Sequence, residues 1–215
     1  MLLHRILTTL IIVTGGYIAF FRPDLLSKNI EHLQKRADQW GWFLAFTLVV
    51  FGSYLLFYYT ESFTEISYYI FCWLLLLGFT DAYSRIIPNR LLYLGLVFWL
   101  ILLLTGDSEI VTVAPAVLIA LLLSTIRFGS QKIWGKPGFG WGDIKLILVL
   151  GLLTGWNIFW ILYIAIISGA FFSLFKILDK KNNYSTVSFA PHIVMGYLLI
   201  EAYQIYEFIL PLIYW

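Results

Sequence analysis

Two aspartates stand apart from the other acidic residues of this sequence because each falls at the end of a long apolar run. Asp81 closes the run "LLLLGFTDAYS", and Asp143 opens the run "GWGDIKLILVL". Carboxylates at membrane depth are costly and usually functional. Two carboxylates held close together resist ionising at the same time, so one keeps a proton while the other stays charged. Such a pair can perform general acid–base catalysis, including hydrolysis of a peptide bond without a metal or a covalent intermediate.

Simpler roles are also open to each aspartate on the sequence alone. An aspartate in the first turn of a helix caps free N–H groups and suits the positive end of the helix dipole, which alone would account for Asp143. Asp81 would sit at the C-terminal end of its helix, where the dipole disfavours an anion, so another reason must place it there. Intramembrane carboxylates also bind cations, which makes an ion- or proton-coupled transporter the alternative function.

The residues around the aspartates suit a site that a second chain can enter. Glycines alternate at positions 138, 140 and 142, just before Asp143, where they let the backbone bend and leave room for substrate main chain. Lys145 either favours the ionised form of Asp143 or marks the cytoplasmic interface. The "IIPN" segment at 86–89 predicts a turn that starts the next helix.

The composition of the whole chain predicts an all-α, polytopic membrane protein. Of its 215 residues, 61% are hydrophobic and only 12% are charged, about half the charged share usual in soluble domains. Continuous apolar runs recur from end to end, whereas a β-barrel would show short segments of alternating polarity. The single cysteine, Cys72, excludes an intramolecular disulfide and a cysteine-rich zinc site. We expect no metal, no cofactor and no nucleic-acid partner, and we expect the lipid bilayer as the surroundings.

Apolar runs long enough to cross a bilayer give about eight spans. Their approximate limits are 4–21, 41–60, 66–80, 90–105, 111–127, 143–155, 157–175 and 188–206. We expect residues 1–60 to form two N-terminal spans and residues 61–215 to form a six-helix membrane core. The polar segment 22–40 fits either a short amphipathic helix on the membrane surface or a solvated linker.

The basic residues give this arrangement an orientation. With eight alternating spans, every lysine and arginine except Arg5 falls on the same side of the membrane. Basic residues concentrate in cytoplasmic loops, so we expect this side to face the cytoplasm and both termini to lie outside. The same alternation puts Asp81 and Asp143 at the cytoplasmic ends of their helices. Because two spans run out and back between them, these helices can be neighbours.

Three segments together resemble a known family. Their order and spacing are similar to those of three landmark segments of the type IV prepilin peptidases, over about residues 66–200. The three segments are "TDAYSRIIPNRLL", "GFGWGDIKLILVLGLLTGW" and "VSFAPHIVMGYLL". The resemblance implies a GxGD-type intramembrane aspartyl protease with Asp81 and Asp143 as the catalytic pair. It implies supporting roles at further positions, namely Pro88, Asn89, Gly140, Gly142, Lys145 and Pro191. Its partner would be a prepilin-like precursor whose short basic leader is cut at the cytoplasmic face of a prokaryotic inner membrane.

The sequence departs from many members of that family in one place. Those members carry a cytoplasmic insert after the first span with two cysteine pairs, expected to bind zinc, and they also methylate the new N-terminus with S-adenosylmethionine. Here the corresponding segment is 22–40, which contains no cysteine. We therefore expect a short form that acts as a peptidase, with N-methyltransferase activity in doubt.

Overall fold

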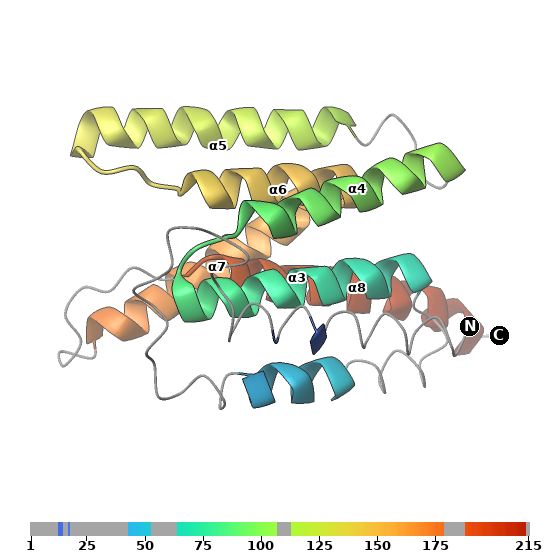
Figure 1. Cartoon of the computed structure of the whole chain (residues 1–215). Helices are drawn as coiled ribbons and strands as arrows, with labels where there is room; N and C mark the ends of the chain where they lie inside the picture. Colours follow the sequence, from blue (N-terminus) through green and yellow to red (C-terminus); the bar gives the residue numbers. More distant parts are fainter. Residues whose placement is uncertain are drawn as a thin grey trace.

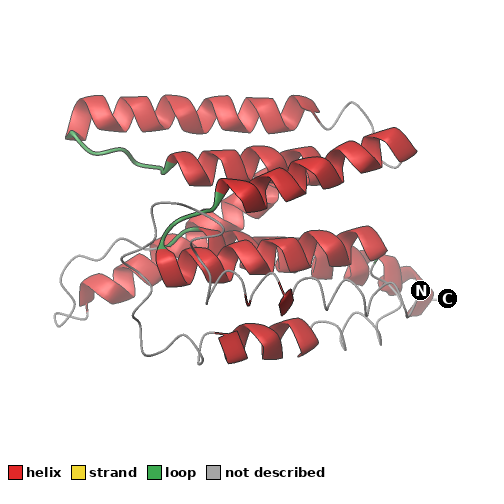
Figure 2. Ribbon diagram, viewed as in Figure 1, coloured by secondary structure: helices red, strands yellow, loops and turns green. Residues whose placement is uncertain are grey.

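The computed structural model describes residues 13–14, 17, 43–52, 64–106, 113–178 and 188–213. Within these ranges every regular element is an α-helix (Figure 2). The six longer helices are α3 (Glu65–Ser84), α4 (Asn89–Thr105), α5 (Val113–Trp134), α6 (Trp141–Thr154), α7 (Asn157–Leu178) and α8 (Ala190–Ile213). The prediction of an all-α fold is confirmed.

Several of these helices have the length and composition of membrane spans. Three of them are both long and apolar enough to cross a bilayer, at Ile66–Ser84, Val113–Trp134 and Asn157–Phe175. Shorter apolar helical segments occupy Phe43–Gly52 and Asn89–Thr105. The membrane-protein class therefore stands, whereas the count of eight spans stays a prediction. All of 22–40 and nearly all of the first predicted span, 4–21, lie outside the described residues.

The turn between α3 and α4 follows the signals in the sequence. Helix α3 ends at Ser84, and its C-cap residue Arg85 adopts a left-handed conformation (φ 56°) and donates its N–H to the Asp81 carbonyl at 2.7 Å. Pro88 then occupies the N-cap position of α4 in an extended conformation, as the "IIPN" turn predicted. Asp81 consequently lies in the last turn of α3, close to the point where the chain reverses.

Helix α5 is longer than predicted, because it ends at Trp134 instead of near residue 127. The prediction stopped where the apolar run gives way to polar residues. Those polar residues continue the helix because they bond to the segment that follows: Ser130 Oγ accepts the N–H of Gly138 at 2.7 Å. The next helix, α6, begins at Trp141 after Pro137 and a run of glycines.

The described helices form two groups that α7 joins (Figure 1). Helices α4, α5 and α6 pack together above, and α3 packs on α8 below. Helix α7 crosses behind them, packing chiefly on α8 and also contacting α6. The helical segment 43–52 lies under α3, and the ring of its Phe46 packs edge-on against Phe79 with centroids 5.3 Å apart. The C-terminal end of α3 and the N-terminal ends of α6 and α8 come together at the left of the view.

The helices approach one another closely where one of them carries a glycine. A Cβ atom at Gly151 of α6 would lie 2.8 Å from Ala116 Cα of α5, and one at Gly78 of α3 would lie 2.8 Å from a methyl of Val194 in α8. Helix association in hydrocarbon relies on such close packing, because no hydrophobic driving force acts between helices there. These contacts fix the position of α3 and α6, the two helices that carry the aspartates.

One side-chain hydrogen bond ties α3 to α4 and gives a prediction. Trp73 Nε1 donates to the Leu91 carbonyl at 2.8 Å, whereas the buried Nε1 of Trp99 in α4 has no acceptor among the described residues. We expect Trp73→Phe to lower the free energy of unfolding by about 1 kcal/mol more than Trp99→Phe does. Thermal unfolding in detergent micelles measures the difference, and equal losses in the two variants would mean that the bond contributes nothing.

Candidate active site

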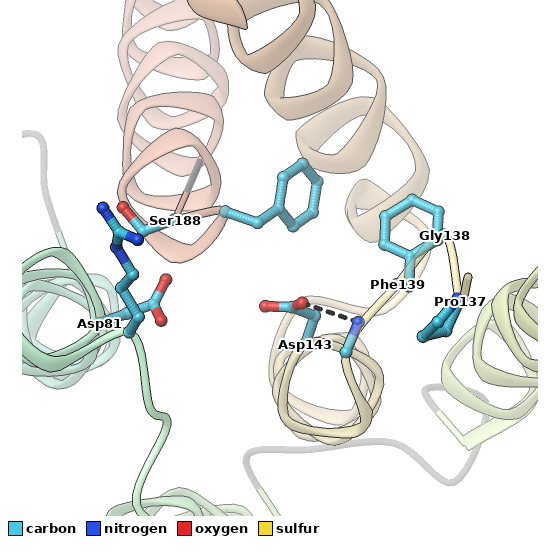
Figure 3. A pocket seen from close by; sticks show the side chains of 9 residues that line it. Asp81, Pro137, Gly138, Phe139, Asp143 and Ser188 are labelled. Carbon is cyan, nitrogen blue, oxygen red and sulfur yellow. Dashed lines mark hydrogen bonds between the residues drawn. The ribbon is translucent and has the colours of Figure 1, made fainter. Parts of the chain in front are cut away.

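Asp81 and Asp143 line one cavity of about 440 Å³. Their side chains come from α3 and α6, and the two carboxylates point toward each other across the cavity (Figure 3). They interact electrostatically. The other lining residues are Arg85, Pro137, Gly138, Phe139, Gly140, Ser188 and Phe189. The structure thus brings together two acidic side chains that are remote in sequence, although α3 packs mainly on α8 and α6 mainly on α5 and α4.

Asp81 is buried at the junction of two helix ends. Its side chain is only 5% exposed, and its Oδ2 accepts a hydrogen bond at 3.2 Å from the N–H of Ala190, the first residue of α8. The C-terminal end of α3 disfavours an anion, but the N-terminal end of α8 offers a positive dipole end and a free N–H group. The start of α8 therefore supplies the stabilisation that α3 does not give to Asp81.

Asp143 is the third residue of α6. Its Oδ2 accepts a hydrogen bond at 3.1 Å from the N–H of Gly140, the N-cap residue (Figure 3). This bond is half of a capping box; the other half needs a side chain at the N-cap, which glycine lacks. Asp143 therefore does cap its helix, as the sequence allowed, but capping does not account for the carboxylate facing the cavity.

Side chains in the last turns of α5 form hydrogen bonds with the segment that precedes α6 and lines the cavity. Ser130 Oγ accepts the N–H of Gly138 at 2.7 Å. Arg127 donates from Nη1 to the Phe139 carbonyl, and its guanidinium carbon lies 4.9 Å from the centre of the Trp141 ring. The same cation interacts electrostatically with Asp143. Two polar side chains of α5 therefore set the path of the glycine-rich segment.

An aromatic pair closes another part of the wall. The rings of Phe139 and Phe189 meet edge-on with centroids 5.6 Å apart, and both residues line the cavity. Phe139 precedes α6, and Phe189 precedes α8, so this contact joins the two segments whose backbone N–H groups bond the aspartates. The cavity consequently has an apolar side next to its carboxylates, where peptide main chain would be shielded from water.

The predicted supporting residues occupy different places. Gly140 lines the cavity. Gly142 packs against the segment leading into α4, where a Cβ would lie 3.2 Å from Ile87 Cβ, and Pro88 is buried at the N-cap of α4. Pro191 lies outside the wall, against α3. The neighbours of Pro191 in the same landmark, Ser188 and Phe189, are the ones that line the cavity.

Lys145 and Asn89 are brought together, but away from the carboxylates. Lys145 Nζ donates to Asn89 Oδ1 at 3.2 Å, and both side chains are exposed. The cation that interacts with Asp143 is Arg127, which sequence reasoning had counted only as a marker of the cytoplasmic side. Lys145 therefore links the N-terminal part of α6 to the first residue of α4, and this position favours the interpretation that Lys145 marks the cytoplasmic interface.

Sequence reasoning missed part of the cavity wall. Arg85 lines the cavity and interacts electrostatically with Asp81, and the two phenylalanines and Ser188 were not singled out. Their only signal was position, because each lies within a few residues of an aspartate or a landmark proline. Within the described ranges, no three His, Cys, Asp or Glu side chains lie together as a metal site requires. The ring of His192 packs near Phe172 instead of lining the cavity.

Comparisons with known proteins bear on this arrangement. Residues 68–174, which include both aspartates, match the model of the type IV leader peptidase family. The "Prepilin leader peptidase/N-methyltransferase" of Escherichia coli (strain K12) is 27% identical over 154 residues, which cover 67% of this chain and 66% of that protein. The proteins of the same name from Aeromonas hydrophila and Aeromonas salmonicida (strain A449) are each 30% identical over 133 residues, or 58% of this chain and 44% of those proteins.

The chain thus spans less than two thirds of the length of these curated relatives. No solved structure gives a significant match. The family match covers α3 to α7, and it contains the "IIPN" turn, the glycine-rich segment and both cavity aspartates. This chain belongs to the type IV leader peptidase family.

Proposed function

We propose that this protein is a membrane-embedded aspartic endopeptidase that cleaves the short basic leader of a prepilin-like precursor. The observation that carries the proposal is the position of Asp81 and Asp143 on facing walls of one cavity. The names of the relatives, which are prepilin leader peptidases, support the substrate class. In this proposal residues 61–215 form the peptidase core and residues 1–60 form two N-terminal spans.

The reaction needs only the pair and a water molecule. The ionised aspartate removes a proton from the water as its oxygen attacks the scissile carbonyl carbon, and the protonated aspartate gives its proton to the carbonyl oxygen. A neutral gem-diol intermediate results. It collapses when the protonated carboxyl gives its proton to the leaving nitrogen, the C–N bond breaks, and one gem-diol hydroxyl gives its proton to the ionised carboxylate, which leaves a carboxylic acid and an amine as products. One proton remains on the pair, so the next cycle can begin.

The distribution of charge supports cleavage at the cytoplasmic face of a prokaryotic inner membrane. The cavity lies at the end of the bundle where α3 ends and α6 begins (Figure 1). The basic residues in or next to the turns at that end are Arg85, Arg90, Arg127, Lys132, Lys136 and Lys145. Positive side chains collect on the cytoplasmic side of membrane proteins. A precursor anchored by an apolar helix would present its leader to the cavity from that side.

The proposal is tested with purified protein in proteoliposomes and a pilin-like precursor. Wild-type protein should shorten the precursor by its leader, seen as a gel shift and located by mass spectrometry. With S-adenosylmethionine present, the new N-terminus should stay unmethylated, because 22–40 lacks the cysteine pairs of the longer forms. An intact precursor together with proton-coupled flux that fails in Asp81→Asn would instead establish the transporter alternative.

A further inference from the structure

We propose that Arg127 is the positioning residue for Asp143, acting through the peptide group between Phe139 and Gly140. The inference rests on the proposed peptidase function and adds to it a residue that lies outside the cavity wall. Arg127 belongs to α5, a helix that provides neither aspartate. Its influence reaches Asp143 by a chain of contacts, each of which the structure shows.

The chain of contacts runs through one peptide group. The Arg127 guanidinium donates to the Phe139 carbonyl, and the N–H of Gly140 donates to Asp143 Oδ2 at 3.1 Å. That carbonyl and that N–H are the two ends of the same planar peptide, on opposite edges of it. A cation bonded to the oxygen polarises the peptide and strengthens the N–H as a donor, because hydrogen bonds in series reinforce one another in a low-dielectric site. Arg127 therefore supports the charged form of Asp143 without touching it.

Two further contacts hold the arginine and the segment in register. The Trp141 ring lies 4.9 Å from the guanidinium carbon, so Arg127 contacts the chain on both sides of Gly140. Ser130 Oγ donates to the Arg127 carbonyl at 2.9 Å and accepts the N–H of Gly138 at 2.7 Å. The segment is thus fixed at three points by one face of α5, and the peptide that bonds Asp143 cannot rotate freely.

The energetics of Arg127 favour a role in the site over a role in stability. Its Nε is buried and has no hydrogen-bond acceptor among the described residues. A partly buried cation with an unused donor is a poor way to stabilise a fold, because desolvation offsets much of what its contacts contribute. The desolvation cost of burying Arg127 is therefore better explained by its effect on Asp143 than by a contribution to the stability of the fold.

The charged groups around Asp143 come from three parts of the fold. Asp81 of α3 and Arg85, the C-cap residue of α3, line the same cavity. Arg127 interacts with Asp143 from α5, whereas Lys145 of α6 has its Nζ on Asn89 and does not line the cavity. Helix α4 adds no residue to the cavity wall. Of these groups, only Arg127 connects to Asp143 through a backbone donor. Its removal should therefore disfavour ionisation of the aspartate pair and loosen the bond to Gly140.

The test compares Arg127→Gln with Lys132→Gln, which removes the same charge from an exposed side chain on the same helix end. In the leader-cleavage assay, Arg127→Gln should lower kcat about 10- to 100-fold with little change in KM. The acid limb of its pH–activity profile should move to higher pH by about one unit. Arg127→Lys, which keeps the charge, should move the limb less, and Lys132→Gln should match wild type.

A second measurement does not depend on catalysis. Amide hydrogen exchange at Gly140 should be faster in Arg127→Gln than in wild type and unchanged in Lys132→Gln. Normal exchange at Gly140, or a loss of kcat with an unmoved acid limb, would overturn the positioning role even if the protein is a peptidase. If wild type fails to cleave the precursor, the proposed function falls, while the exchange result still decides whether Arg127 orders this bond.

Discussion

Asp81→Asn and Asp143→Asn should each reduce leader cleavage by about a thousandfold or more, while the protein should still insert and fold. The expected size follows from the loss of a residue that acts as one unit with its partner. An amide cannot take a proton from water or give one to the scissile carbonyl, so either substitution removes one half of the acid–base pair. Precursor cleavage by purified variants, with size-exclusion profiles in detergent as the check on folding, measures the effect.

The asparagine variants separate catalysis from capping. Asparagine keeps a side-chain oxygen, so it can still accept the N–H of Ala190 at position 81 or of Gly140 at position 143. Alanine at either position loses the bond as well, and should lower the free energy of unfolding by about 1–2 kcal/mol. If both aspartates serve only as caps, the asparagine variants will cleave the precursor normally and the alanine variants will fail through instability.

Gly151→Leu should have a large structural effect on the packing of α6, the helix that carries Asp143. A Cβ at Gly151 would lie 2.8 Å from Ala116 Cα, and a backbone atom cannot move aside as a flexible side chain can. Helices α5 and α6 must then separate, which should cost about 3 kcal/mol or more and displace Asp143 from the cavity. Both the thermal unfolding midpoint and cleavage should fall.

Gly129→Leu is the matched control for this substitution. Gly129 lies on α5, and nothing stands within 4 Å of a Cβ built there. Because leucine favours a helix more than glycine does, this variant should be as stable as wild type and should keep its activity. If the two variants lose stability equally, close packing at Gly151 is not what holds α6 in place.

Much of the fold followed from the sequence because membrane helices need long apolar runs. The ends of helices α4 and α6 lie within two residues of the predicted limits 90–105 and 143–155. These limits were predictable because the proline of "IIPN" and the glycine-rich segment mark where each helix begins. The end of α5 did not follow, because Arg127 and Ser130 extend that helix by bonding to residues after it. A hydropathy pattern carries no information about such bonds.

The topology of the spans made it possible to predict that the two aspartates lie close together. The groups that bond to each aspartate or interact with it could not be predicted from the sequence. Alternating spans put Asp81 and Asp143 at the same end of the bundle, which is a matter of counting helices. The N–H of Ala190 that bonds Asp81 lies 109 residues further along the chain, and no local pattern links the two. The sequence left two roles open for Lys145, which is near Asp143 along the chain, and did not point to Arg127, which interacts with Asp143 from another helix.

The most direct measurement of the central claim is a cross-link between the two aspartate positions. Cys72 is the only cysteine and is buried, so Cys72→Ala provides a background for Asp81→Cys with Asp143→Cys. A short bifunctional thiol reagent should join this pair efficiently in membranes. It should not join Asp81→Cys with Thr154→Cys, at the other end of α6 and about 15 Å or more further away. A pair at 81 and 143 that links no better than this control would contradict the account.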